Sequence, residues 1–236
     1  MNLLDLVWPP TCLVCGKPID RDESPVQDPL RRVAACPDCR EASRSPTPRH
    51  RCPVCSIPLP RHVERCERCR REEFAFRRAI ALHRYDGTPA DIVRAYKFGR
   101  HRSLARLIGA ALAPVIAAHS SPDALIVPAP SRRRSVRVRG FAAADLIARE
   151  AGRCADRRVR ALLALNANSA QKTLAYAARR DNARRAVSPR RRLRVPERVV
   201  LVDDVLTTGT TADACSRVLL ELGAHEVLVV TFAIEY

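Results

Sequence analysis

Eight of the ten cysteines in this 236-residue chain stand in four Cys-x-x-Cys pairs. The pairs are Cys12/Cys15, Cys36/Cys39, Cys52/Cys55 and Cys66/Cys69. One pair directs two thiolates at a single point, and two pairs complete a tetrahedral site without an open position. We therefore predict one or two structural Zn²⁺ ions. Joining neighbouring pairs would give two sites, while crossed pairing, a single filled site and an iron–sulfur cluster stay open as alternatives.

A second group of residues follows the apolar run 199–202, which is typical of a buried strand. Two carboxylates come first, Asp203 and Asp204, and then a loop made of Thr207, Thr208, Gly209, Thr210 and Thr211. Loop N–H groups, a helix dipole and threonine hydroxyls suit a phosphate. Adjacent carboxylates suit the vicinal hydroxyls of a ribose and, indirectly, Mg²⁺. In parallel sheets such sites lie beyond the carboxyl ends of strands, so we predict a site for a ribose 5-phosphate here.

Apolar runs and helical patterns alternate along most of the chain, and these elements must position the loop. We expect strands within 73–85 and at 124–127, 199–202 and 226–232, and helices at 91–98, 104–118, 141–151 and 211–222, the third capped by Gly152 and the fourth closed by Gly223. Continuously apolar strands separated by helices indicate a mainly parallel sheet covered on both faces. The sequence thus predicts an α/β domain at 73–236, preceded by a small zinc-ribbon-like cysteine module at 1–72. We expect Cys154 and Cys215 to be buried helix residues.

The chain is strongly basic, with a net charge of +17. Such a charge attracts polyanions, although an aromatic content of 4% argues against base-stacking platforms. The nucleic-acid candidates are Arg184, Arg185, Arg190, Arg191 and Arg192, with a solvated arginine-rich linker as the alternative. The apolar stretch 107–118 is too short to span a bilayer and the first residues lack signal-peptide features, so we expect a cytoplasmic protein without membrane insertion.

The acidic strand end with its Thr-Thr-Gly-Thr-Thr loop resembles the phosphoribosyl-pyrophosphate (PRPP) signature of type I phosphoribosyltransferases. Together with the four cysteine pairs, three further stretches look like a ComF-type competence protein: Tyr96-Lys97-Phe98-Gly99, Val127-Pro128-Ala129-Pro130 and Arg139-Gly140-Phe141. Gln171, Arg179 and Asn182 fall where that family carries a Q…R-x-x-N stretch. The resemblance covers nearly the whole chain, but Ala142-Ala143 stands where the family usually has Asn-Gln.

The resemblance implies a type I phosphoribosyltransferase-like fold and Mg²⁺-dependent transfer of the phosphoribosyl group of PRPP to an unidentified acceptor. Asp203 and Asp204 would bind the ribose hydroxyls and support Mg²⁺, and 207–211 would hold the 5-phosphate. The candidate pyrophosphate contacts are Lys97, Ser131, Arg132 and Arg139, of which Lys97 joins the two acids as a catalytic candidate. Residues 171–182 would close over the donor, unless they form a surface helix.

The same family is associated with the uptake of single-stranded DNA during natural transformation. The alternative function is therefore a non-catalytic adaptor that binds single-stranded DNA and the competence machinery, with a regulatory or vestigial PRPP site.

Overall fold

The computed structural model describes residues 10–19, 30, 33–46, 50–166, 186–190 and 194–236, and all structural statements concern these residues. Four strands form one sheet in the order β1-β6-β5-β2, and every neighbouring pair in it is parallel. The strands are β1 (Arg78–Arg84), β2 (Leu125–Pro128), β5 (Arg198–Leu206) and β6 (Glu226–Ile234). A separate antiparallel pair consists of β3 (Leu163–Leu165) and β4 (Val187–Pro189).

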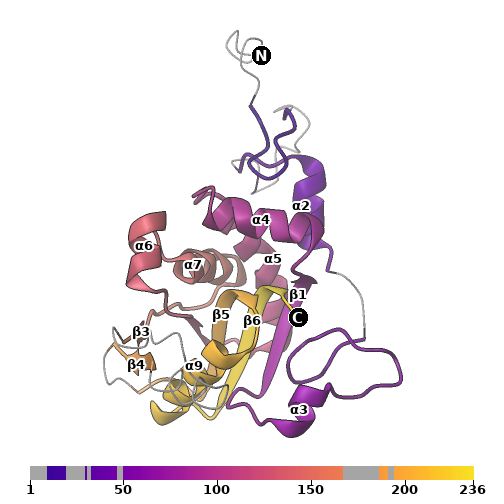
Figure 1. Ribbon diagram of the computed structural model, residues 1–236. Helices are drawn as coiled ribbons and strands as arrows, with labels where there is room; N and C mark the ends of the chain where they lie inside the picture. The colour runs from indigo at the N-terminus through magenta and orange to yellow at the C-terminus, as the bar shows by residue number, and fades with distance from the viewer. Residues whose placement is uncertain (1–9, 20–29, 31–32, 47–49, 167–185, 191–193) are drawn as a thin grey trace.

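Helices cover both faces of the parallel sheet (Figure 1). The helices are α2 (Pro37–Arg44), α3 (Glu67–Arg71), α4 (Gly87–Lys97), α5 (Leu104–His119), α6 (Arg133–Arg139), α7 (Ala143–Ala155) and α9 (Thr210–Glu221). Helices α4, α5 and α7 pack on the face that carries Val200 and Val202, whereas α9 packs on the face that carries Val199 and Leu201. Alternate side chains of β5 therefore enter two different cores, which explains why the strand is apolar without interruption. The expected α/β class, a mainly parallel sheet flanked by helices, is confirmed.

The structure differs from the sequence prediction at the end of α7. The helix continues to Ala155 and ends at Asp156, which has a φ of 52°, so the prediction of Gly152 as the cap is wrong. Gly152 is buried inside the helix, where a Cβ atom would collide with Val159 Cγ2. Cys154 is exposed on this helix, contrary to the expectation, whereas Cys215 is buried as expected.

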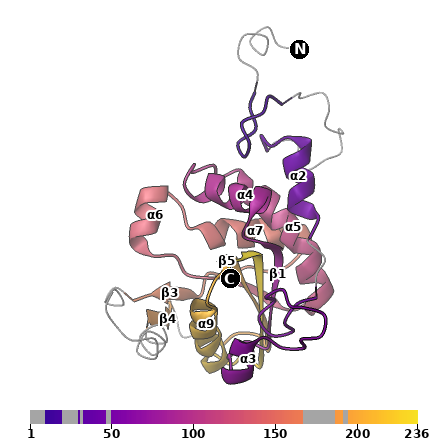
Figure 2. The same ribbon diagram turned by 45° about the vertical axis from the view of Figure 1, so that its right-hand side comes forward.

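The cysteine module contacts the outer strand β1 through its second half (Figure 2). Ala79 N donates to Val54 O at 2.7 Å, and Ala81 N donates to Ser56 Oγ at 3.1 Å. The Arg51 guanidinium donates to the carbonyl oxygens of Ala81 and Leu82 at 3.0 and 3.1 Å. These bonds satisfy an edge of β1 that would otherwise present free backbone groups.

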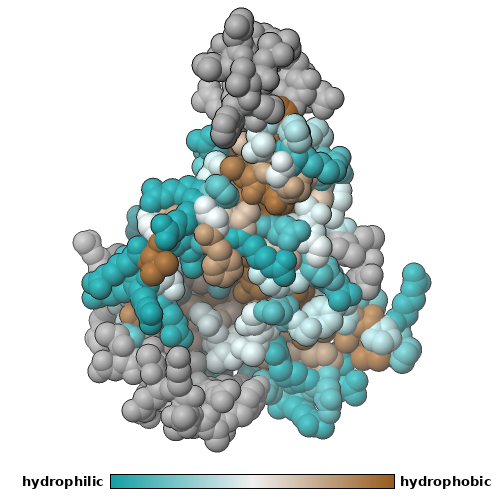
Figure 3. Space-filling view, turned by 45° about the horizontal axis from the view of Figure 1, so that its top comes forward, coloured by the Kyte–Doolittle hydropathy of each residue, from teal (hydrophilic) through white to brown (hydrophobic). Residues whose placement is uncertain are grey.

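Hydrophilic side chains cover much of the face drawn in Figure 3, with separate hydrophobic areas between them. The large hydrophobic residues that remain exposed in the described part are Phe98, Val138 and Tyr236. Among the described residues, no helix is both long and apolar enough to cross a membrane.

Candidate functional site

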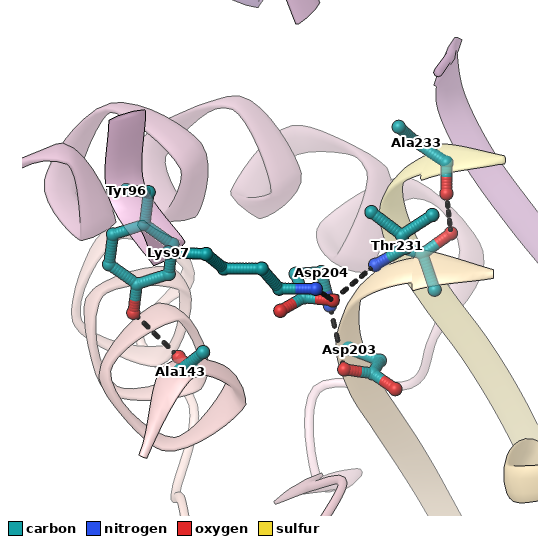
Figure 4. Close-up of polar contacts among 8 residues, drawn as sticks. Tyr96, Lys97, Ala143, Asp203, Asp204, Thr231 and Ala233 are labelled. Carbon is teal, nitrogen blue, oxygen red and sulfur yellow. Dashed lines mark hydrogen bonds and ion pairs between the residues drawn. The ribbon is translucent and has the colours of Figure 1, made fainter. Parts of the chain in front are cut away.

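The two carboxylates near the end of β5 lie close to a lysine from α4. Lys97 Nζ is 2.8 Å from Asp204 Oδ1, so the only described lysine of the α/β part reaches the acidic strand end (Figure 4). Asp204 Oδ1 also accepts from Val205 N at 2.7 Å, and Asp203 Oδ1 accepts from Asp204 N at 2.8 Å. Lys97 and the two acids are far apart in sequence, and the fold brings them together.

The two acids differ in their surroundings. Asp204 is buried and paired with Lys97, whereas Asp203 has no ion pair in the described part of the chain. Burial, with the neighbouring Asp204 carboxylate, raises the pKa of Asp203 to about 7, against the opposing effects of the Asp204 N–H and of Lys97. Asp203 therefore changes its protonation near neutral pH.

Tyr96 fixes the position of α4 next to Lys97. Its hydroxyl donates to Ala143 O at 2.7 Å, and its ring centroid is 5.1 Å from that of Phe141 (Figure 4). Burial, and then the Asp204 charge, raise the pKa of Tyr96. Because Ala143 contributes its backbone carbonyl, this anchor does not depend on the Ala143 side chain.

The threonine loop joins β5 to the N-terminus of α9. Thr208 and Thr210 hydroxyl oxygens are 2.9 Å apart, and Thr207, Thr208 and Thr211 are exposed. Gly209 has a φ of 72°, a conformation that favours glycine. The loop thus presents threonine hydroxyls and the N-terminal end of α9 at the same strand end as the two acids.

The remaining candidates lie around this strand end without direct contact to the acids. β2 ends beside β5, with Ala129 N donating to Val202 O at 2.9 Å, and Ser131 and Arg132 follow it. Arg139 ends α6, and its guanidinium lies 5.8 Å from the Phe141 ring centroid. No hydrogen bond or ion pair joins these three side chains to the carboxylates within the described ranges. Seven further residues named from the sequence lie outside the described residues: Gln171, Arg179, Asn182, Arg184, Arg185, Arg191 and Arg192.

Of the five arginines predicted to contact nucleic acid, Arg190 is the only one among the described residues. It is exposed, and its Nε donates to Leu163 O at 2.9 Å. This bond ties the residue to β3, so at least part of its side chain serves the local fold.

The cysteines form two clusters, each built from neighbouring pairs. One consists of Cys12, Cys15, Cys36 and Cys39, and the other of Cys52, Cys55, Cys66 and Cys69. Within each cluster the sulfur atoms lie within 4.8 Å of one another, and both Cys15–Cys36 and Cys55–Cys66 are 3.6 Å apart. Crossed pairing is therefore wrong for this fold. Each cluster offers four convergent thiols, and among the described residues no His, Asp or Glu joins them, which is a ligand set of structural zinc.

The two clusters repeat the same local geometry. A residue with positive φ follows each first pair, Gly16 at 74° and Ser56 at 66°, and a short helix begins after Cys36 and after Cys66. Burial opposes ionisation of Cys12, but the N–H groups of Cys15, Cys36 and Val14 lower its pKa to about 7. Matching N–H groups lower the pKa of Cys52 to about 7. Each cluster thus stabilises a thiolate that zinc requires.

Comparison with known proteins gives matches over the module and over most of the chain. Residues 3–70 match the double zinc ribbon domain family. The chain is 28% identical over 235 residues to the DNA utilization protein YhgH of Escherichia coli O6:H1, covering 95% of this chain and 96% of that protein. It is 28% identical over 192 residues to Competence protein F of Haemophilus influenzae, covering 75% and 82%.

Two solved structures show a weaker similarity. One is described as the allosteric regulatory enzyme of purine biosynthesis, with a TM-score of 0.35, 24% identity, and coverage of 54% of this chain and 25% of that chain. The other is a hypoxanthine phosphoribosyltransferase from Staphylococcus aureus, with a TM-score of 0.36, 12% identity, and coverage of 54% and 61%.

The fold and the site define an α/β protein that carries an acidic strand end with a threonine loop and two tetracysteine clusters in an N-terminal double zinc ribbon. The resemblance to the ComF-type competence proteins is confirmed by relatives that align with most of this chain.

Proposed function

We propose that this protein binds PRPP and transfers its phosphoribosyl group to a nitrogenous acceptor. The observation that carries the proposal is the contact of Lys97, from α4, with the acidic end of β5, which leads through the threonine loop into α9. Cationic, carboxylate and phosphate-binding groups then lie at one strand end, which matches the charges and hydroxyls of a phosphorylated ribose.

In this reaction the bond between the anomeric carbon and pyrophosphate breaks, and a bond to the acceptor nitrogen forms on the opposite face. Departure of pyrophosphate needs charge neutralisation more than it needs a strong base. Lys97 supplies a fixed cation there, and Arg132 and Arg139, at the two ends of α6, are further candidates for contact with the pyrophosphate. The carboxylates of Asp203 and Asp204 orient the ribose hydroxyls. Mg²⁺, when bound, neutralises the pyrophosphate, and carboxylate oxygens of this kind are ligands that it accepts.

The test is calorimetric titration of zinc-loaded protein with PRPP and Mg²⁺. Wild type is expected to bind, and the double variant Asp203→Asn/Asp204→Asn is expected to lose binding. Asp91→Asn is a matched control, because Asp91 pairs with Arg94 on the exposed side of α4. Pyrophosphate release with candidate acceptors then tests turnover. Absence of binding by wild type would reject the proposal.

A second function, binding of single-stranded nucleic acid, is favoured by a separate basic hollow at the start of β2. The hollow is lined by Arg158, Arg160 and Arg194, over an apolar floor that includes Leu125 and Leu162. Among the described residues no carboxylate lines it, so three guanidinium groups are available to phosphates above an apolar surface. Leu125 begins β2, so this hollow lies away from the strand end that carries the acids.

Nucleic-acid binding is tested with a fluorescent oligonucleotide over a salt series. The triple variant Arg158→Gln/Arg160→Gln/Arg194→Gln is expected to weaken binding and to reduce the logarithmic salt slope by about 2. The control triple variant Arg94→Gln/Arg149→Gln/Arg153→Gln removes the same charge from arginines that already pair with acids. Equal losses in both variants would show a general charge effect and reject the hollow as the site.

A further inference from the structure

An arginine of the second zinc ribbon lies against the threonine loop. Arg68 belongs to α3, between the zinc-cluster residues Cys66 and Cys69. A Cβ atom at Gly209 would lie 3.5 Å from Arg68 Nη2 and 3.4 Å from Phe74 Cε1. The Arg68 side chain of α3 thus reaches Gly209, which precedes the first residue of α9. A side chain from the ribbon therefore touches the loop that the proposed function assigns to a phosphate.

The Arg68 guanidinium lacks an acceptor in the described part of the chain. Its Nε is buried and has no hydrogen-bond partner there, and no carboxylate pairs with it. Besides its approach to Gly209, the guanidinium lies over the Phe74 ring, 5.3 Å from the centroid. The neighbouring arginines of α3 are engaged, since Arg71 pairs with Glu67 at 2.6 Å and Arg70 Nε donates to Arg65 O at 2.9 Å. A buried donor without an acceptor is costly, which indicates a missing anionic partner.

The positive end of the α9 helix dipole also favours an anion beside Arg68. Arg68 lies at the N-terminal end of this helix, where the dipole is positive. The acid in the first turn, Asp213, is already used, because it accepts from Ala75 N at 2.7 Å and pairs with Arg217 at 3.2 Å. A guanidinium and a helix N-terminus thus meet beside threonine hydroxyls. This combination suits a phosphate monoester, which accepts several charge-assisted bonds at once.

We propose that Arg68 binds the phosphate monoester held by the threonine loop, so that the second zinc ribbon forms part of the ligand site. This inference rests on the proposed function, which assigns the 5-phosphate of PRPP to the loop. It also gives the second zinc cluster a role in binding. Cys69 N donates to Cys66 Sγ at 3.4 Å, so ligation of these two residues fixes the helix that carries Arg68. Affinity for a phosphorylated sugar is then expected to depend on the second cluster and not on the first.

The experiment compares ribose 5-phosphate with pyrophosphate as calorimetric ligands of the zinc-loaded full chain. Arg68→Met keeps an unbranched apolar stem that packs on Phe74 but removes the charge. It is expected to weaken ribose 5-phosphate on the order of tenfold or more and to leave pyrophosphate binding unchanged. Arg71→Met, on the same helix, is the matched control and is expected to behave as wild type with both ligands.

Three results would reject the assignment of Arg68, and they distinguish its failure from failure of the proposed function. Wild-type affinity of Arg68→Met for ribose 5-phosphate would reject Arg68 as a ligand. An equal loss of both ligands would assign Arg68 to loop packing alone and would also reject it. Failure of wild type to bind PRPP or ribose 5-phosphate would instead reject the proposed function, and with it this assignment.

The zinc dependence is tested with one ligand variant in each cluster, checked for retained secondary structure by circular dichroism. Cys15→Ser in the first cluster is expected to keep ribose 5-phosphate affinity, and Cys55→Ser in the second is expected to lose it. Equal affinities in the two variants would reject a specific role of the second ribbon.

Discussion

At the scale of single residues, the adjacent acids Asp203 and Asp204 have different partners. Lys97 offsets the buried charge of Asp204. The raised pKa of Asp203 means that the folded protein disfavours the ionised form of this carboxyl group. Such an arrangement costs folding stability and leaves Asp203 ready for an external partner, such as sugar hydroxyls or a cation. The site therefore contains one acid whose charge is offset by Lys97 and one acid without an ion pair in the described part of the chain.

This asymmetry predicts that Asp203→Asn stabilises the protein at alkaline pH. The folded-state pKa lies above the unfolded value of 3.8, so the folded state binds the proton more tightly and the wild type loses stability as pH rises between these two values. The variant lacks this loss. We expect it to be more stable by about 1–3 kcal/mol at pH 8, and by less than half of that at pH 5.

Urea unfolding of zinc-loaded protein at both pH values measures the difference, with Asp91→Asn as a surface control. A variant less stable than wild type at pH 8 would contradict the raised pKa of Asp203.

The sequence predicted the acids and the threonine loop because strand end and loop are contiguous in the chain. It indicated Lys97 only through a resemblance, since the contact with Asp204 joins distant segments. Arg68 had no signal at all. It lies between zinc-binding cysteines, where the sequence does not distinguish a ligand-binding arginine from a solvated one. Only the packing of the second ribbon against the α/β part brings it to Gly209.

At the scale of elements, β1 is held by the cysteine module from two sides. From the second ribbon, the turn at 54–56 and the Arg51 side chain hydrogen-bond to the backbone of β1. From the first ribbon, Ser43 O near the end of α2 lies 3.0 Å from Nε2 of His83, a residue of β1. His83 also packs on Phe232 of β6, with ring centroids 4.8 Å apart. One side chain thus joins the first ribbon's helix to the sheet.

This contact predicts a pH-dependent loss of stability. Burial lowers the pKa of His83, and the Arg51 charge adds to this effect. Below the unfolded pKa of 6.5 the unfolded chain gains a proton that the folded chain resists, so stability falls as pH falls. His83→Gln can donate the same bond to Ser43 without titrating. We expect the wild type to lose about 1 kcal/mol more than this variant between pH 7.5 and pH 5.5.

Chemical unfolding of both proteins across this pH range is the measurement. Parallel pH profiles for wild type and variant would show that His83 does not contribute. A common residual slope is expected, because the pKa of His119 is also lowered by burial.

Element prediction succeeded where apolar residues are continuous and failed where they are absent. The strands and the helices α4, α5, α7 and α9 carry strong apolar faces, although α4 begins a turn earlier than expected. α6 has no buried residue, so no periodicity marks it. The short helices α2 and α3 are fixed by the cysteines that precede them rather than by propensity.

At the scale of the whole molecule, the two zinc ribbons have unequal environments. All four cysteines of the second cluster are buried, and this ribbon is bonded along β1. In the first cluster Cys15 is exposed. A chelator therefore has direct access to one cluster only.

We expect zinc release in two phases when a chelator is added to the native protein. About one equivalent leaves rapidly from the first cluster, and the second leaves slowly because it requires undocking of the ribbon from β1. A colorimetric zinc indicator follows both phases. Cys15→Ser should remove the rapid phase alone; a single phase in the wild type, with two zinc ions bound at the start, would contradict unequal accessibility.

The bonding of the second ribbon to β1 has a consequence for the order of events during synthesis. β1 pairs with β6 in a register that sets Arg78 opposite Leu228, so its sheet partner leaves the ribosome long after β1 itself. The ribbon, in contrast, precedes β1 directly and can reach it as soon as both have emerged. Local contacts form before distant ones, and unpaired strand edges are prone to aggregate. The metal-binding ribbon is thus the earliest partner open to β1, and it covers one edge of a strand whose sheet partner is synthesised much later.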